Sequence, residues 1–380
     1  MKPAISSGTR GSVPPVRVVF EEEDRKAIIR EIDACLSSGM VATGKKVKEF
    51  EEMWAAYCRT RYGVACSSGG SALSILMTAL DVREKEVLVP TNTFIATVNA
   101  VTLAGGNPIF LDTDPATMGV SLAEIQAKVT PETVGVVVVH IGGVMTPDMP
   151  QIAEWCREKG LWLVEDAAHA HGSESDGCRS GGFGIAAAYS FFATKTVTSG
   201  EGGAIVTNDE GLAQLCRSLT DYGKRSQWES YHSLVSMNHR MSEISAIIAI
   251  AQVRRLDDFI ASREAAAAEY TKALGEPLRL VLPVGRSSWY KYIAVLPPGI
   301  DRSAFKARVK ERGASLSGGV YDIPVHLQPV FESARLAGKL PQAERLCASH
   351  ICFPIFYGMA QEQVDTVVEA ALSTLSEMHA

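Results

Sequence analysis

The chain has 380 residues, more than one ordinary domain contains, so about two domains are expected. Its hydrophobic content of 46%, charged content of 21% and net charge of −6 are those of a globular protein without a strongly basic surface, and nucleic acid is not an expected partner. No apolar run reaches the roughly 18 residues of a membrane-spanning helix, and the polar N-terminus lacks the apolar core of a secretory signal.

The N-terminal part begins with a loose arm over residues 1–15, followed by amphipathic helices at 20–38 and 47–57. From residue 62 to about 207, short apolar runs alternate with helical patterns. Strands are predicted at 62–65, 87–89, 108–111, 134–140, 161–165, 187–192 and 204–207, and helices at 71–80, 93–104, 121–128 and 149–159. Because the strands are continuously apolar, we expect a sheet covered on both faces, which is an α/β fold with mostly parallel strands.

A long helical stretch over 242–274 is predicted to lead into a smaller C-terminal domain. In that domain we expect a strand at 290–296, a helix at 302–312, a segment broken by Gly and Pro at 313–330, and a last helix at 361–378. The predicted division is an N-terminal arm over 1–15, a large domain over 16–250 and a small domain over 251–380.

The eight cysteines are scattered along the chain, and none forms a CxxC pair. In a chain of this length the pattern predicts reduced thiols and a cytoplasmic location. Cys347 and Cys352 lack a partner pair, so no metal site is expected.

Lys195 stands alone among apolar and small residues and is followed by a Gly-rich turn at 200–203. Asp166 comes directly after the predicted buried strand at 161–165. A shielded lysine and a carboxylate at a strand end are the minimum needed to hold pyridoxal 5′-phosphate (PLP). The lysine forms a Schiff base with the aldehyde, and the carboxylate keeps the pyridine nitrogen protonated.

Three residues are candidates for the phosphate of this cofactor. Gly70 and Ser71 open the helix at 71–80, where free backbone N–H groups suit a phosphate and the Ser71 hydroxyl can add one more donor. The alternative is a plain helix cap. Ser190, five residues before Lys195, can face the same pocket from its strand.

Two further residues are candidates for contact with the cofactor ring. Phe94 follows the strand at 87–89, at the edge where ligands bind in open α/β sheets, although a core position is the alternative. His169 can lie against the ring or its 3′-oxygen, or can be a half-buried structural histidine. Asn238 can cap the helix that follows it.

Taken together, these motifs resemble the DegT/DnrJ/EryC1/StrS family of PLP-dependent sugar aminotransferases, from about residue 20 to 371. The matching segments are 44–51, 68–73, 90–97, 165–172, 190–208, 238–243, 325–329 and 354–359. The resemblance implies the three-layer architecture of fold type I PLP-dependent transferases, with a large PLP-binding domain and a smaller C-terminal α+β domain.

The resemblance also implies roles for the candidate residues. Lys195 would form the Schiff base, Asp166 would pair with the pyridine nitrogen, and His169 and Phe94 would lie against the ring. Ser190 would bind the phosphate, together with the backbone at Gly70 and Ser71.

Asn238 falls where the family reaches across a dimer interface to the partner's phosphate, which implies a homodimer with shared active sites. Tyr321 and His326 fall in a segment that approaches the substrate in relatives. Two departures from the family pattern affect these inferences. Gly70 and Ser71 replace a usual Thr-Ala pair, and the segment 313–324 differs from the common form.

The implied reaction is a ping-pong transamination, with L-glutamate as the expected amino donor. The expected acceptor is a keto sugar, most simply a nucleotide-linked 3- or 4-keto-6-deoxy sugar, in the synthesis of a surface polysaccharide or a secondary metabolite. The stretch at 190–203 is similar to relatives that aminate C4 of a GDP-linked sugar, and Lys195 argues against the deoxygenating branch, which has histidine there. Alternatives are an aminotransferase on a cyclitol ketone or another small carbonyl compound, a PLP-dependent eliminase or dehydratase, and a PLP-binding regulator.

Overall fold

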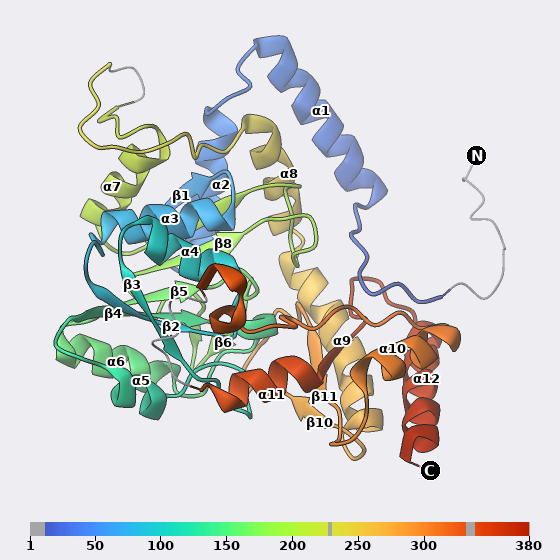
Figure 1. Cartoon of the computed structure of the whole chain (residues 1–380). Helices are drawn as coiled ribbons and strands as arrows, with labels where there is room; N and C mark the ends of the chain where they lie inside the picture. Colours follow the sequence, from blue (N-terminus) through green and yellow to red (C-terminus); the bar gives the residue numbers. More distant parts are fainter. Residues whose placement is uncertain (1–11, 227–229, 332–338, 380) are drawn as a thin grey trace.

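The computed structural model describes residues 12–226, 230–331 and 339–379, and its centre is a sheet of seven strands (Figure 1). The strand order is β1-β9-β8-β5-β4-β2-β3. The strands are β1 (Tyr62–Cys66), β2 (Glu86–Pro90), β3 (Asn107–Leu111), β4 (Thr133–Val139), β5 (Trp162–Asp166), β8 (Ala186–Ser190) and β9 (Gly203–Thr207). The pairs β2–β3, β2–β4, β4–β5 and β5–β8 are parallel, which confirms the predicted α/β fold.

Strand β9 runs antiparallel to both of its neighbours, β8 and β1. The chain returns from Ser190 to Gly203 without a helix, through a turn in which Gly200 has φ +82°. A parallel partner would need a long crossover, so the short connection dictates the direction of β9. The same turn carries Lys195 over the end of the sheet.

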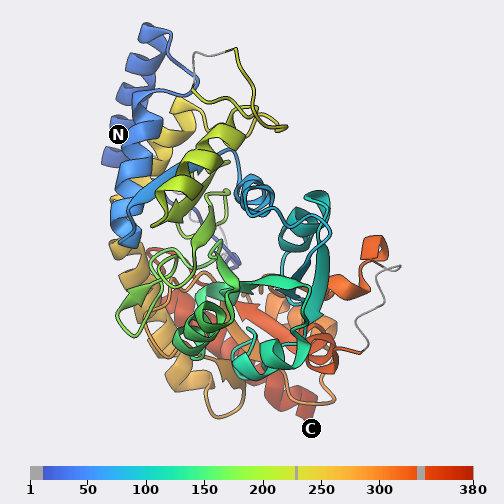
Figure 2. The same cartoon turned by 90° about the vertical axis from the view of Figure 1, so that its left-hand side faces the viewer.

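Helices cover both faces of the sheet and complete three layers. On one face lie α3 (Gly69–Ala79), α4 (Ile95–Leu103) and α7 (Glu210–Thr220), and on the other lie α2 (Lys45–Cys58), α5 (Leu122–Lys128), α6 (Met149–Lys159), α8 (Glu243–Val253) and the start of α9 (Leu256–Leu274). Alternation along β2 shows the division, since Val87 and Val89 belong to the first core and Leu88 to the second. Helix α1 (Glu22–Ser38) packs on α8, and Figure 2 shows α1, α2 and α8 along one side of the molecule.

A smaller antiparallel sheet forms a second core at the C-terminal end (lower right in Figure 1). Its strands are β10 (Arg279–Val281), β11 (Tyr292–Val295) and β12 (His350–Phe353), and its helices are α10 (Arg302–Glu311), α11 (Pro341–Ser349) and α12 (Gln361–His379). Short elements are β6 (Glu174–Ser175), β7 (Cys178–Arg179) and the 3-10 helices at Ile141–Gly143 and Val325–Leu327. Within the described residues, no helix combines the length and hydropathy needed to cross a bilayer.

The helix expected over 242–274 is two helices, with the break at Arg254 and Arg255. The acidic residues Asp257 and Asp258 then open α9, where negative charge is favourable. The predicted domain boundary at residue 250 falls inside α8, and the domain division stays a prediction. Of the predicted arm, residues 1–11 lie outside the described residues, while Val13 pairs with Ala314 of the small core.

The buried carboxylate of Glu243 joins the start of α8 to the start of α2. It accepts hydrogen bonds from the backbone N–H groups of Gly44, Lys46 and Val47 at 2.9, 3.0 and 2.8 Å. The first N–H groups of a helix have no acceptor within that helix, so a side chain distant in sequence completes the cap. Gly44 has little room for a side chain, because a Cβ there would lie 3.1 Å from the carboxyl group.

Replacing Glu243 with alanine should therefore lower the free energy of unfolding by about 2–4 kcal/mol, because three N–H groups lose a charged acceptor. Urea denaturation followed by circular dichroism measures the change. Glu264, an exposed carboxylate on α9, provides the matched control, and Glu264→Ala should change the free energy by less than about 0.5 kcal/mol. Equal effects of the two substitutions would contradict the capping role.

Candidate active site

The candidate site lies at the carboxyl ends of β5 and β8, which are adjacent in the sheet. Asp166 is the last residue of β5, and Ser190 is the last residue of β8. Ligands of open α/β sheets bind at this edge. The fold thus brings together two of the predicted residues that are far apart in the sequence.

Asp166 is almost fully buried, with 4% of its surface exposed. One carboxylate oxygen accepts a hydrogen bond from the Thr97 hydroxyl at 2.7 Å, and the other accepts one from the Ala168 N–H at 3.2 Å. Among the described residues, no basic nitrogen lies within 4.0 Å of the carboxylate. Burial raises the pKa of Asp166, against the opposing effects of Thr97, Ala168 and the charge of Lys195.

Lys195 is half-buried, and its Nζ lies 4.7 Å from the centroid of the Tyr290 ring. Burial lowers the pKa of Lys195 from 10.5 to about 8, although the nearby charge of Asp166 acts in the opposite direction. The two groups influence each other without a direct ion pair. With this pKa, about one-tenth of the amine is in the nucleophilic, unprotonated form at pH 7, far more than for an ordinary lysine with a pKa of about 10.4.

The Tyr290 ring beside this lysine belongs to a cluster of aromatic rings. The imidazole of His169 stacks on Tyr290, with centroids 4.3 Å apart and planes 27° apart, and its Nδ1 accepts the N–H of Gly142 at 3.3 Å. Burial lowers the pKa of His169 well below its usual value, so the ring is neutral. The Tyr321 ring lies 6.1 Å from His169 and 6.4 Å from Phe94. Phe94 is 60% exposed, so the structure excludes the alternative that it is a core residue.

The start of α3 approaches the end of β8 closely. A Cβ on Gly69 would lie 2.8 Å from the Cβ of Ser190, so glycine is required for this approach. The hydroxyl of Ser68 caps the helix by accepting the Ser71 N–H at 3.0 Å. In the described part of the chain, the N–H groups of Gly69 and Gly70 have no acceptor. They are available for an anion at this helix start.

His239 also belongs to this region and was not predicted. Its Nδ1 lies 3.1 Å from the Ser71 hydroxyl, and its carbonyl accepts the Ser67 N–H at 2.7 Å. Its neighbour Asn238 is exposed, and the Asn238 side chain accepts the N–H of Arg240 at 3.1 Å. No contact between the Asn238 side chain and the start of α3 is present among the described residues.

His326 lies apart from this cluster. Its Nδ1 is 2.7 Å from the Thr91 hydroxyl and its Nε2 is 3.4 Å from the Glu344 carboxylate. Both ring nitrogens are thus engaged in tying the segment at 325–327 to the end of β2. These contacts favour a structural role for His326, whereas Tyr321 lies within the cluster.

Three other residues in or beside the site carried no sequence signal that we used. Thr97 and Tyr290 contact Asp166 and Lys195, as described above. Glu165 precedes Asp166 and is fully buried, where it contacts His140 at 2.9 Å. The alternation of side chains along β5 could have indicated that Glu165 and Asp166 point to opposite faces.

The arrangement fits PLP. The buried carboxylate of Asp166 lacks the positive charge that a protonated pyridine nitrogen would provide. The free N–H groups of Gly69 and Gly70 lack the acceptor that a phosphate would provide. The amine of Lys195 lies close enough to Asp166 for their charges to interact, and its lowered pKa favours bond formation with an aldehyde.

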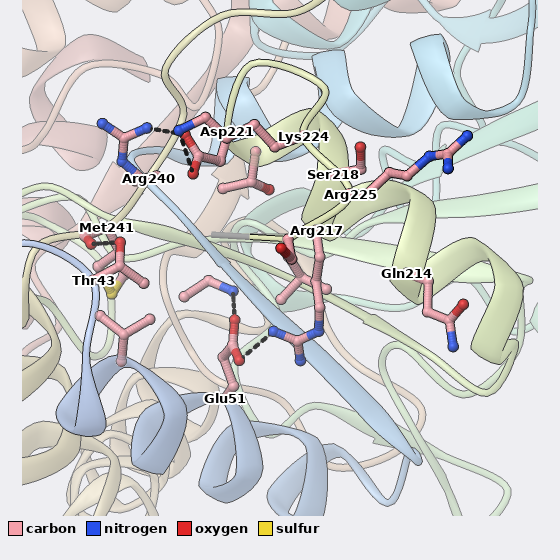
Figure 3. Close-up of a pocket in the computed structure, with 15 residues that line it drawn as sticks. Thr43, Glu51, Gln214, Arg217, Ser218, Asp221, Lys224, Arg225, Arg240 and Met241 are labelled. Atoms are coloured by element: carbon pink, nitrogen blue, oxygen red, sulfur yellow. Dashed lines mark hydrogen bonds and ion pairs between the residues drawn. The ribbon is translucent and has the colours of Figure 1, made fainter. Parts of the chain in front are cut away.

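A separate pocket of about 410 Å³ opens at the edge strand β1, between α2 and α7 (Figure 3). Its lining holds four basic side chains and two acidic ones: Glu51 pairs with Arg217 at 2.6 Å, and Asp221 pairs with both Arg240 and Lys224. None of the predicted site residues lines it. The chemistry is therefore assigned to the sheet edge and not to this pocket.

The rate at which PLP attaches to the apoprotein should follow the deprotonation of Lys195. We expect the rate to rise about tenfold per pH unit below pH 8 and to level off above it, whereas an ordinary lysine would show a rise up to about pH 10. Stopped-flow absorbance of the lysine-bound cofactor measures this profile. In Asp166→Asn the bend should move to lower pH, because the negative charge that raises the pKa of Lys195 is lost. A bend above about pH 9.5 in the unsubstituted protein would refute the lowered pKa.

Comparison with known proteins identifies the family. The chain matches the model of the DegT/DnrJ/EryC1/StrS aminotransferase family over residues 22–372. It is 35% identical to a pleiotropic regulatory protein of Geobacillus stearothermophilus, over 92% of this chain and 94% of that protein. It is 32% identical to the GDP-perosamine synthase of Caulobacter vibrioides, over 88% of this chain and 92% of that protein.

Among solved structures, DesV of S. venezuelae has the same fold, with a TM-score of 0.89 and 30% identity over 96% of this chain and 99% of that one. The predicted fold type I architecture is thereby confirmed. The chain belongs to the DegT/DnrJ/EryC1/StrS aminotransferase family and is a PLP-dependent aminotransferase.

Proposed function

We propose that the protein moves an amino group from L-glutamate to the keto group of a nucleotide-linked sugar, most simply a 3- or 4-keto-6-deoxy sugar. One observation carries the proposal: a half-buried amine and a buried carboxylate lie at the same sheet edge, each without a contacting counter-charge. The GDP-perosamine synthase of Caulobacter vibrioides, by its name, makes an amino sugar nucleotide, which supports a sugar acceptor.

When bound, PLP supplies an aldehyde that takes up the amino group and a pyridine ring that delocalises the negative charge at the reacting carbon. The Nζ of Lys195 holds the cofactor and, once the donor has displaced it, takes the proton from the donor's Cα. Its lowered pKa suits it to act as a base near neutral pH. Asp166, oriented by Thr97, stabilises the positive charge on the ring nitrogen.

The alternatives are less well supported by these contacts. The name of the Geobacillus relative describes regulation, but the presence of both Lys195 and Asp166 at the sheet edge of this chain favours catalysis. A cyclitol ketone or another small carbonyl acceptor would use the same half-reaction with glutamate, and an eliminase would not. Product analysis separates these cases.

We also propose a homodimer in which Asn238 contacts the partner's phosphate site. The segment before Asn238 supports an interface, because it presents Tyr222, Val235 and Met237 with 41%, 96% and 68% of their surfaces exposed. All eight cysteines are free thiols, and the cytoplasmic location expected from them is part of the proposal.

Adding L-glutamate to the PLP-loaded protein should bleach the absorbance of the lysine-bound cofactor and release 2-oxoglutarate. Lys195→Ala should reduce this turnover by at least about 10³-fold, because both the attachment point and the base are lost. Absorbance and product assays follow the reaction. A protein that binds PLP but ignores glutamate would reject glutamate as donor, and substantial turnover by Lys195→Ala would reject the role of the lysine.

Mixing two inactive variants tests whether Asn238 acts across an interface. A hybrid of Lys195→Ala and Asn238→Ala subunits would contain one site with both residues intact, and an equal mixture should recover about a quarter of the original activity. If Asn238 serves its own chain, no activity returns. Analytical ultracentrifugation of the unmixed proteins checks that a dimer is present.

A further inference from the structure

Lys291 is a second amine beside the reactive lysine. It lies immediately before β11, and its N–H donates to the Gly142 carbonyl at 3.1 Å. Its Nζ lies 5.2 Å from the centroid of the Tyr290 ring, the same ring that lies 4.7 Å from the Nζ of Lys195. The two ammonium groups therefore share one aromatic neighbour at the site.

The charge of Lys291 is half-buried and has no counter-charge in contact. Its Nζ approaches the Ser317 hydroxyl at 3.4 Å, and no carboxylate in the described part of the chain lies within 4.0 Å. Burial lowers the pKa of Lys291, which shows that the environment disfavours the isolated charge. An unpaired cation in a low-dielectric site is costly unless a ligand provides the anion.

Arg263, another buried cation near Tyr290, differs in this respect. Its guanidinium donates to the carbonyls of Trp289 and Ile355 at 3.2 and 2.9 Å. These two carbonyls accept from Nη1 and join α9 to the ends of neighbouring segments, which favours a structural role for Arg263. In the described part of the chain, the Lys291 amine contacts a hydroxyl and an aromatic ring and has no carbonyl or carboxylate acceptor.

The position of Lys291 relative to the reacting groups indicates which anion it would meet. Its charge is one cause of the lowered pKa of both Lys195 and His169, after burial in each case. In an amino acid the carboxylate is attached to the carbon whose amino group reacts, so its anchor must lie beside Lys195. In a nucleotide-linked sugar, the ring separates the diphosphate from a 3- or 4-keto group, which would place a phosphate anchor farther away.

We propose that Lys291 anchors the carboxylate of the amino-acid donor, with the Ser317 hydroxyl beside it. The proposal rests on the function proposed above and adds a binding residue to it. Ser317 lies in the segment 313–324, in which this chain departs from the common family form. The ammonium group would form a charge-assisted hydrogen bond with the carboxylate. Such a bond is stronger than one between neutral groups.

Binding of glutarate, which has the carboxylates of glutamate but no amino group, tests the anchor without turnover. Calorimetric titration into the PLP-loaded enzyme should show a loss of affinity of about 10- to 100-fold in Lys291→Met and a smaller loss in Lys291→Arg. Lys272→Met, at an exposed position on α9, is the matched control and should bind glutarate normally. The absorbance of the lysine-bound cofactor shows that each variant is folded and loaded.

In the half-reaction, Lys291→Met should raise the glutamate concentration needed for half-maximal bleaching by a similar factor and should change the maximal rate less. Unchanged glutarate affinity in Lys291→Met, or no glutarate binding by the unsubstituted enzyme, overturns the proposal. A loss of pyrophosphate binding in place of glutarate binding also overturns it, because the anchor would then serve the acceptor. Bleaching of the unsubstituted enzyme by glutamate tests the proposed function separately, so the two can fail independently.

Discussion

Two opposite charges are brought to one sheet edge without touching, and the site depends on this separation. A direct salt bridge between Asp166 and Lys195 would satisfy each with the other and leave no reason to bind a charged ring. Instead, neutral groups hold them: the Thr97 hydroxyl and the Ala168 N–H on the carboxylate, and the Tyr290 ring beside the amine. Burial then favours the uncharged form of both, raising the pKa of the acid and lowering that of the base. A cofactor with a basic ring nitrogen and an aldehyde would give Asp166 a positively charged partner and Lys195 a group to react with.

Glu165, the residue before Asp166 on β5, has a structural role, whereas Asp166 is available to the cofactor. Glu165 accepts the N–H groups of Gly181, Phe183 and Gly184 at 2.8, 2.9 and 3.0 Å, besides its contact with His140. Each carboxylate oxygen of Glu165 therefore has two partners. Glu165 holds the loop before β8, and neither oxygen is left to bind a ligand. Because side chains alternate along a strand, the next residue faces the other way and remains available. Two adjacent carboxylates thus have different roles.

The elements and residues that could be predicted from the sequence are those determined by patterns within a few neighbouring residues. The apolar runs of β2, β4 and β5 and the Gly-rich turn after Lys195 are readable within a few residues, and both lie in the described structure where they were expected. The break between α8 and α9 was missed because Arg254 and Arg255 are good helix formers, and only packing redirects the chain there. Tyr290 and His239 reach the site from distant segments, so no local pattern indicates them. The expectation that His326 approaches the substrate stays a prediction, while the contacts of its ring with Thr91 and Glu344 could not be read from the sequence because they require the folded chain.

Helix α9 takes part in both hydrophobic cores. Leu256, Phe259 and Ile260 pack with the large core, whereas Ala267, Tyr270 and Leu274 pack with the small one. A continuous helix shared in this way works as a stiff rod between the two bodies. This sharing also limits where two relatives can be joined in a chimaera that is made to transfer acceptor preference with the C-terminal segment. A junction at Arg254 lies between two helices, but it would bring in α9 from the other protein. The first half of that helix would then have to pack against the large core of this chain. A junction after Leu274 keeps the first half of the helix with its own sheet but leaves Ala267, Tyr270 and Leu274 against a foreign small core, so either junction requires one half of α9 to be refitted.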